Sequence, residues 1–434
     1  MDKKPLNFKK DERKAEAWSK KRYSAWIKTL PQNRQEALEA FKRSSKEMNR
    51  KLNEVRGNID ELTDKQLKKQ IKDMNIMIKQ PVNLLKERQI IYAHFDPKDL
   101  GYSNELQMLV GSQSRQLDRG KIKTVVNEYK YGNLTDLKTG NLTLSGGESG
   151  QYYVAELELP KGTYVGHFED GQTVLPTDYA IEITNNMFSK PKVIRENGKE
   201  LIKVNARLIK KEKIENKVKE TEAALNKMLN KDTDFVKLNI GGGFESYTID
   251  QAKEAIHALI EHVPSKLLND ALDELDSIVF QDVKIRENNP RGLFDENTNT
   301  VFIRVKHETF IQNIDQSADP ARGLIHEIGH VADIVLFNKT SYSPRFNGIY
   351  EEEKNNITNI VTYQDYATRN AQEFFAEIFK AMYSTDPKQQ DAVKNEAPKA
   401  VNYINTKIKE YIEDNNKQIW VRECFLPNCC VGSR

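Results

Sequence analysis

Two histidines four residues apart, inside an apolar stretch from Gly323 to Phe337, constrain this chain more than any other feature. They belong to the run His326-Glu327-Ile328-Gly329-His330. Residues four apart lie one above the other on the same face of a helix, so both imidazoles can bind one metal ion. The carboxylate of Glu327, beside the first histidine, can then act on a water at the metal. The pattern predicts a helix over 322–337 that carries the metal site of a zinc peptidase.

A second helix, predicted at about 369–383, supplies acidic side chains. A catalytic zinc normally takes three protein ligands, and Glu373 is the best candidate for the third. Glu373 and Glu377 share a helix face among phenylalanines, where an acid is unfavourable unless it is paired or ligated. One of the two can bind the metal while the other holds the far nitrogen of a histidine, a role that Asp333 could also fill. The alternative is that both glutamates form an ordinary solvated stripe.

Glu327 is predicted to be the general base, acting on a water whose pKa the zinc lowers toward about 7. The oxyanion needs a further donor, and a tyrosine on the loop before the second helix could provide it. Tyr363 and Tyr366 are both available, and helix spacing does not choose between them. The strand predicted at 300–305 is either an edge strand that pairs with extended substrate or a plain core strand.

The composition is that of a water-soluble chain with room for two or three domains. It has 434 residues, of which 38% are hydrophobic and 30% are charged. No stretch approaches the roughly 20 apolar residues of a membrane span, so no permanent membrane insertion is expected. The net charge of +3 does not argue for nucleic acid, although residues 1–50 alone carry a net charge of +8.

No signal peptide pattern opens the sequence, because lysines follow Met1 where an apolar core would be needed. Either export is unconventional, or a leader has been removed, or the protein stays inside the cell. The three cysteines, Cys424, Cys429 and Cys430, all lie in the last eleven residues. A body without disulfides suits a chain that must unfold and refold or work in a reducing cytosol. The cysteines are expected to lie on a flexible tail rather than in a metal site.

The chain is predicted to belong to the α+β class, with helices first and strands after them. Residues 10–90 have helical periodicity with breaks near Asn58 and Pro81, and strand patterns follow up to about 205. A charged helix at 210–231 leads to a second, mostly helical domain. Its expected elements are helices at 249–262, 265–277, 369–383 and 397–413, the strand at 300–305, the motif helix and an acidic loop near 345–360. The predicted domains are 1–205, 206–417 and a tail at 418–434.

Residues 292–413 resemble the catalytic domain of the anthrax lethal factor-type zinc metallopeptidases. The resemblance rests on the Gly292–Ile303 and Gly323–Asp333 stretches, on Tyr366 through Glu377 and on Ser384-Thr385-Asp386. It implies a zincin-type, lethal factor-like domain. It implies His326, His330 and Glu373 as zinc ligands, Glu327 as base and Tyr366, rather than Tyr363, as the transition-state tyrosine. The implied reaction is endoproteolysis of a host protein.

The first 205 residues are similar to the amino-terminal domain of the enzymatic component of iota-type and insecticidal binary toxins. Lys14 through Trp18, Ile90-Ile91-Tyr92 and the Leu159–Thr163 turn carry that resemblance. It implies an ADP-ribosyltransferase-like fold that docks on a separate pore-forming component. Ala93 stands where an active transferase has arginine, Leu142 through Ser145 replace Ser-Thr-Ser, and Asp170-Gly171-Gln172 replace Glu-x-Glu. The domain is therefore predicted to be degenerate.

Together these features predict a toxin effector with one zinc ion and no other cofactor. The chain is expected to be a monomer before it assembles with its pore-forming partner, and to be secreted and then translocated into the host cytosol. Two alternatives remain: an ADP-ribosyltransferase toxin, or a non-catalytic adaptor with a structural zinc.

Overall fold

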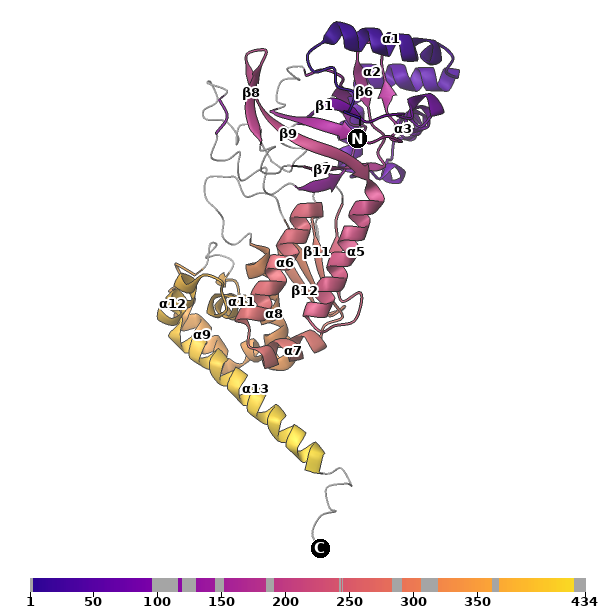
Figure 1. Cartoon of the computed structure of the whole chain (residues 1–434). Coiled ribbons are helices and arrows are strands. Elements are labelled where there is room, and N and C mark those ends of the chain that lie inside the picture. The colour runs from indigo at the N-terminus through magenta and orange to yellow at the C-terminus, as the bar shows by residue number, and fades with distance from the viewer. Residues whose placement is uncertain are drawn as a thin grey trace. The chain divides into compact units, whose positions relative to one another are not determined.

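The computed structural model in Figure 1 describes residues 3–95, 116–118, 130–144, 152–184, 191–241, 243, 245–282, 291–305, 319–360 and 367–424, with side chains up to 413. The chain forms two compact units. The first is built mainly from Met1–Glu220 and Ile240–Tyr247, and the second from Thr221–Asn239, Thr248–Thr309 and the chain after Asn313.

The first unit begins with three helices. They are α1 (Glu12–Lys28), α2 (Gln32–Glu54) and α3 (Lys65–Ile78). Asp11 and Asp64 cap α1 and α3 by accepting hydrogen bonds from backbone N–H groups of the first turn. Apolar residues of α2 and α3 pack against one another in a single core: Leu38, Phe41, Leu52, Ile71, Met74 and Met77. The helical periodicity predicted for residues 10–90 is confirmed.

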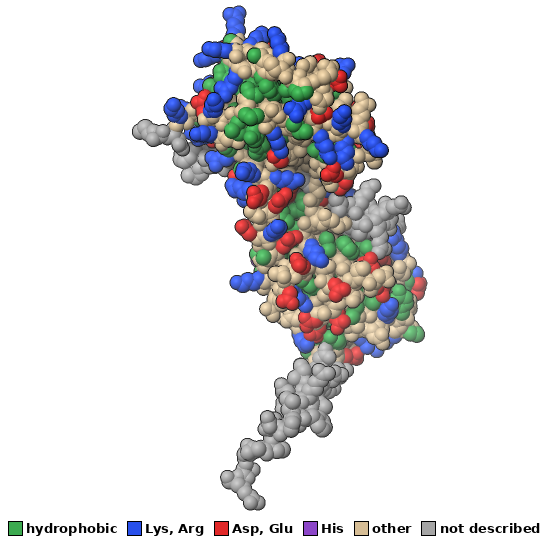
Figure 2. Space-filling model, turned by 90° about the vertical axis from the view of Figure 1, so that its right-hand side faces the viewer, with side chains coloured by type: hydrophobic (Ala, Val, Ile, Leu, Met, Phe, Trp, Pro, Cys, Tyr) green, Lys and Arg blue, Asp and Glu red, His purple; other side chains and the backbone are tan. Residues whose placement is uncertain are grey.

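A mixed sheet follows the helices in the first unit. Its strands are β1 (Gln89–Phe95), β2 (Tyr131–Asn133), β3 (Thr139–Asn141), β4 (Tyr153–Leu159), β5 (Gly166–His167), β6 (Gln172–Val174), β7 (Tyr179–Ile183), β8 (Lys192–Glu196) and β9 (Lys199–Lys210). The order is β2-β7-β9-β4-β1-β3-β6-β5, with β8 also paired to β9. The β4–β9 pair is parallel and the other described pairs are antiparallel. Lysine and arginine side chains are spread over the face of this unit shown in Figure 2.

The second unit contains a smaller sheet. Its strands are β10 (Val236–Asn239), β11 (Ser277–Gln281), β13 (Thr300–Arg304) and β12 (Gly292–Asp295), in that spatial order. The first three are mutually parallel, and β12 runs antiparallel to β13. The strand predicted at 300–305 is therefore a core strand, and its reading as an edge strand is wrong. The edge belongs to β12, because a tight turn after Asp295 folds the chain back so that β12 covers the outer side of β13.

Helices make up most of the second unit. They are α5 (Lys211–Met228, which starts in the first unit), α6 (Glu245–His262), α7 (Ser265–Asp273), α8 (Pro320–Val331), α9 (Pro344–Glu353), α11 (Ala371–Met382), α12 (Pro387–Glu396) and α13 (Pro398–Cys424). The last helix continues to Cys424 instead of ending near 413. Cys429 and Cys430 lie outside the described residues.

The prediction of an acidic loop near 345–360 is wrong over its first half, which forms α9. The Ser343 hydroxyl caps this helix by accepting a hydrogen bond from the Phe346 N–H, and Pro344 occupies the first helical position. Phe346 and Tyr350 are four residues apart and both are buried. Because several glutamates follow Tyr350, this segment is acidic overall, and its composition does not reveal the buried apolar pair.

The predicted α+β class is confirmed, with a sheet-rich first unit and a largely helical second one. Within the described part of the chain, no helix has both the length and the apolar character needed to cross a membrane.

Candidate metal centre

Helix α8 carries the two histidines in a fully packed environment. Asp319 caps it by accepting a hydrogen bond of 2.9 Å from the Ala321 N–H, and Pro320 starts the first turn. His326, Glu327 and His330 are 5%, 4% and 7% exposed. The predicted helix over 322–337 is continuous, but its last turn, Ala332–Leu336, is a π-helical turn. A buried helix of this kind holds the imidazoles in fixed positions.

Helix α11 crosses α8 at the position of Gly329. Its first turn is fixed by Asn370, whose side chain accepts a hydrogen bond of 2.8 Å from the Glu373 N–H. A Cβ at Gly329 would lie 3.2 Å from the Cβ of Phe379 and 3.3 Å from the Cα of Ala376. The glycine between the histidines therefore allows the two helices to approach closely. This approach brings Glu373 within reach of the histidines.

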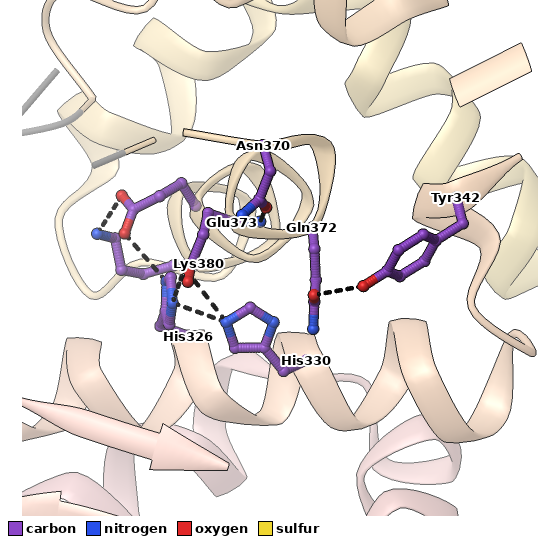
Figure 3. Close-up of polar contacts among 8 residues, drawn as sticks. His326, His330, Tyr342, Asn370, Gln372, Glu373 and Lys380 are labelled. Atoms are coloured by element: carbon purple, nitrogen blue, oxygen red, sulfur yellow. Dashed lines mark hydrogen bonds and ion pairs between the residues drawn. The ribbon is translucent and has the colours of Figure 1, made fainter. Parts of the chain in front are cut away.

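Figure 3 shows the three side chains converging from the two helices. The Nε2 atoms of His326 and His330 lie 3.1 Å apart, and each lies 3.4 Å from Oε2 of Glu373. Their potential ligand atoms all lie within 4.8 Å of one another. Two imidazoles and one carboxylate are the donor set of many catalytic zinc sites, so the residues fit this metal.

Two opposing effects set the charges of this cluster. Burial alone would lower the pKa of His326, but the Glu373 and Glu377 carboxylates outweigh it and raise this pKa to about 10. Burial alone would raise the pKa of Glu373, but the two imidazoles 3.4 Å from its Oε2 lower it overall. The cluster thus places the ionised carboxylate of Glu373 beside the basic imidazole of His326. A divalent cation can replace the proton on this imidazole.

Glu377 contacts the nitrogen of His326 that faces away from the cluster. Its Oε1 lies 3.0 Å from Nδ1 of His326, and its Oε2 accepts a hydrogen bond from the buried Lys380 ammonium. Burial would raise the pKa of Glu377, but Lys380 and His326 lower it to about 2. A proton held on Nδ1 leaves the lone pair of Nε2 directed at the cluster. Lys380, which was not singled out from the sequence, keeps the carboxylate ionised.

Asp333 lies one turn beyond His330 and has a different contact. Its Oδ1 accepts a hydrogen bond of 2.8 Å from the Ser341 N–H. Its Oδ2 and Nδ1 of His330 are both buried, and neither has a hydrogen-bond partner within the described residues. That Asp333 orients a histidine therefore stays a prediction. A water that bridges Oδ2 of Asp333 and Nδ1 of His330 would make this contact.

Glu327 lies on the side of α8 that faces strand β12. Its carboxylate accepts a hydrogen bond from the backbone N–H of Phe294, and burial raises its pKa. A Cβ at Gly292 would lie 2.3 Å from Oε1 of Glu327. These contacts were not predicted, because they join residues far apart in the sequence. In the sequence, Gly292 is marked only by the family resemblance of the stretch that it begins.

Tyr363 and Tyr366 lie outside the described residues, so the choice between them stays a prediction. Within the described part of the chain, His326, His330 and Glu373 are the one group of three or more potential ligands found close together.

The transferase-like positions of the first unit can be located in part. Ala93 is fully buried in β1, and Leu142 and Thr143 follow β3. Asp170 and Gly171 form the turn between β5 and β6, where Gly171 has a φ of +84°. Ser145 lies outside the described residues. An alanine methyl group buried at position 93 cannot bind a phosphate as an arginine would.

Two family models match separate parts of this chain. Residues 15–164 match the family model described as ADP-ribosyltransferase exoenzyme. Residues 217–407 match the model described as anthrax toxin lethal factor, N- and C-terminal domain. Both resemblances predicted from the sequence are confirmed.

One characterised relative is the lethal factor of Bacillus anthracis, which is 22% identical over 401 residues. The match covers 84% of this chain and 48% of the relative, so the chain spans about half the length of the protein it matches.

Two solved structures are similar to part of the chain. Plx2a, an ADP-ribosyltransferase toxin from Paenibacillus larvae, is 21% identical, covers 47% of this chain and 99% of its own, and gives a TM-score of 0.39. BECa, an ADP-ribosylating toxin of a binary enterotoxin of C. perfringens, is 16% identical, covers 76% of this chain and 67% of its own, and gives a TM-score of 0.41.

Proposed function

We propose that this chain is the enzymatic component of a two-component toxin and that its second unit is a zinc endopeptidase. The observation that carries the proposal is the convergence of His326, His330 and Glu373 within 4.8 Å, beside the buried Glu327. The match of residues 217–407 to the lethal factor model supports the same reaction.

In this mechanism His326, His330 and Glu373 hold the zinc. The ion, when bound, lowers the pKa of a water and polarises the scissile carbonyl. Glu327 takes the proton of the attacking water and returns it to the leaving amine. Glu377 keeps the Nδ1 proton of His326 in place. Tyr366 is proposed, on the resemblance alone, to donate a hydrogen bond to the developing oxyanion.

Among the described strands, β12 ends the sheet, and its outer edge suits an extended peptide as substrate. A sheet edge offers backbone N–H and C=O groups to a further strand, and here that edge lies beside Glu327, which itself takes the Phe294 N–H. A folded protein would need to present a flexible segment at this edge. We therefore propose an endopeptidase that acts on exposed, extended segments of a host cytosolic protein.

The test of the proposal is a search for new amino termini. Target-cell lysate is treated with the parent protein or with Glu327→Gln, and the amino termini are compared by mass spectrometry. The parent should create a small set of new termini, which a chelator suppresses and Glu327→Gln does not create. Identical termini in both samples would contradict the proposal.

The first unit is proposed to dock on a pore-forming partner, in line with its match to the exoenzyme model. We propose the division 1–205, 206–417 and 418–434 for docking, catalysis and tail, and a route of secretion followed by entry into the host cytosol. Full-length Glu327→Gln should compete with the parent for cell entry, because docking does not use the peptidase site. Failure to compete at a large excess would count against this role.

A second candidate function is ADP-ribosyl transfer, which the match of residues 15–164 favours. The buried Ala93 opposes it. If the purified chain consumes NAD above the level of a control without enzyme, ADP-ribosyl transfer would be favoured over a docking role alone for the first unit. The third possibility, a structural zinc, requires a fourth protein ligand, and the described residues place three at the cluster.

A further inference from the structure

We infer that strand β12 positions Glu327, with the Phe294 N–H holding its carboxylate and Gly292 leaving the space that its side chain occupies. Both are positioning residues and not catalytic ones. The inference rests on the proposed peptidase function.

The pairing of β12 with β13 determines which of its backbone groups face outward. The N–H of Arg304 donates to the carbonyl of Arg291 at 2.8 Å, which makes these two a hydrogen-bonded pair. Hydrogen-bonded and non-hydrogen-bonded pairs alternate along an antiparallel ladder. Leu293 therefore bonds with Phe302 across the ladder, whereas the backbone groups of Gly292 and Phe294 point away from β13.

The outward N–H of Phe294 meets the carboxylate of Glu327, which is its hydrogen-bond acceptor. A hydrogen bond to a carboxylate is stronger than one between neutral groups, and here both partners are buried. Helix α8 fixes the backbone of Glu327, and the contact with Phe294 of β12 restricts the rotamer of its side chain.

Gly292 lies two residues before Phe294 and faces the same side of the sheet. A Cβ built there would lie 2.3 Å from Oε1 of Glu327 and 2.9 Å from both its Cδ and its Cγ. Carbon and oxygen atoms in ordinary contact are about 3.5 Å apart, so any side chain at position 292 must displace the glutamate. These three nearest atoms all belong to the movable side chain of Glu327.

In this arrangement a substitution at Gly292 can impair catalysis without changing the fold. A methyl group at position 292 can be accommodated by rotation of the Glu327 side chain, so the backbone and the zinc ligands can stay in place. A general base that moves by about 1 Å loses its alignment, which lowers the turnover rate by about 10²-fold. We therefore expect kcat to fall while KM and zinc content change little.

The first experiment compares Gly292→Ala with Gly323→Ala, using full-length protein and a fluorogenic peptide selected from a library with the parent. Gly323 also lies on the site elements, but a Cβ there meets nothing within 4 Å. Gly292→Ala should lose about 10²-fold in kcat with KM and zinc content retained, and Gly323→Ala should stay within about twofold. A kcat of Gly292→Ala within about threefold of the parent, with zinc bound, would overturn the inference.

A second experiment does not depend on activity or on the folding of Gly292→Ala. Amide hydrogen exchange is followed by NMR at Phe294 and at Leu293 in the parent and in Glu327→Ala. Loss of the carboxylate acceptor should speed exchange at Phe294 by about tenfold or more and leave Leu293 unchanged, since Leu293 bonds within the ladder. Equal exchange at Phe294 in both proteins would show that Glu327 does not contact this N–H.

The two experiments also distinguish this inference from the proposed function. A parent that cleaves no peptide removes the peptidase proposal, whereas the exchange result still tests the contact. An active parent with an unaffected Gly292→Ala removes the positioning role alone.

Discussion

At the scale of single residues, the two glutamates of α11 have different contacts. Glu373 lies 3.4 Å from the Nε2 atoms of both histidines, whereas Glu377 lies 3.0 Å from the far nitrogen of His326 and pairs with Lys380. The sequence places both on one helix face and makes Glu373 the best candidate for the third ligand. The contacts favour Glu373 as ligand and Glu377 as the residue that orients His326.

This difference predicts unequal effects of two matched substitutions. Glu373→Gln should lose most of its zinc, because it removes the negative charge of a direct ligand. Glu377→Gln should still bind zinc, with an affinity about 10–100-fold weaker, as is usual for an outer partner of a ligand. Zinc content after dialysis against a graded chelator measures both. Equal losses in the two variants would show that the roles are shared.

The oxyanion donor is a second prediction about single residues. Tyr366→Phe should lower kcat by roughly 10²–10³-fold with KM and zinc content nearly unchanged, because one transition-state hydrogen bond is lost. Tyr363→Phe, the matched control three residues earlier, should be close to the parent. The reverse pattern in steady-state kinetics would move the role to Tyr363.

At the scale of secondary-structure elements, the crossing of α8 and α11 assembles the cluster. Gly329→Ala adds a methyl group 3.2 Å from the Cβ of Phe379, which must push the two helices apart. We expect a loss of about 1–3 kcal/mol in the free energy of unfolding and weaker zinc binding. Gly323→Ala on the same helix should be neutral or slightly stabilising. Thermal unfolding with and without chelator measures both effects, and unchanged zinc affinity in a stable Gly329→Ala would contradict this account.

The same elements show what a sequence can and cannot reveal. The spacings of His326 with His330 and of Glu373 with Glu377 are local and follow from helix geometry, so they predict which residues share a face. Gly329 and Gly292 act through close contacts with segments distant in the sequence, and their spacing carries no sign of this. The order β11-β13-β12 likewise depends on where a turn returns the chain, so an edge strand could not be told from a core strand.

At the scale of the whole molecule, the first unit is expected to lose stability in acid. In the first unit, His167 is fully buried, stacks on Tyr23 with ring centroids 4.6 Å apart, and contacts Trp18. Burial, with a smaller effect of the nearby Arg22, lowers the pKa of His167 to about 3. The unfolded chain keeps a pKa of about 6.5 at this histidine. The stability that depends on the neutral imidazole is therefore complete above about pH 6.5 and is lost progressively as the pH falls toward 3.

This linkage predicts that the first unit loses about 2 kcal/mol of stability from His167 alone between pH 7.5 and pH 5. Tryptophan fluorescence in a Trp420→Phe background reports on this unit, because Trp18 and Trp26 both belong to it. His167→Phe should remove this part of the pH dependence, whereas His257→Phe, at an exposed position, should retain it. The same pH dependence in all three proteins would assign acid sensitivity to other groups.

The central claim about the whole molecule, that it is a zinc endopeptidase with Glu327 as its base, is tested most directly by one paired measurement. Zinc content and turnover of a peptide substrate are determined on the same preparation of Glu327→Gln, with the exposed Glu261→Gln as control. We predict about one zinc per chain in both variants and a kcat about 10²–10⁴-fold lower in Glu327→Gln alone. A zinc-loaded Glu327→Gln whose kcat lies within about tenfold of the parent would contradict the account.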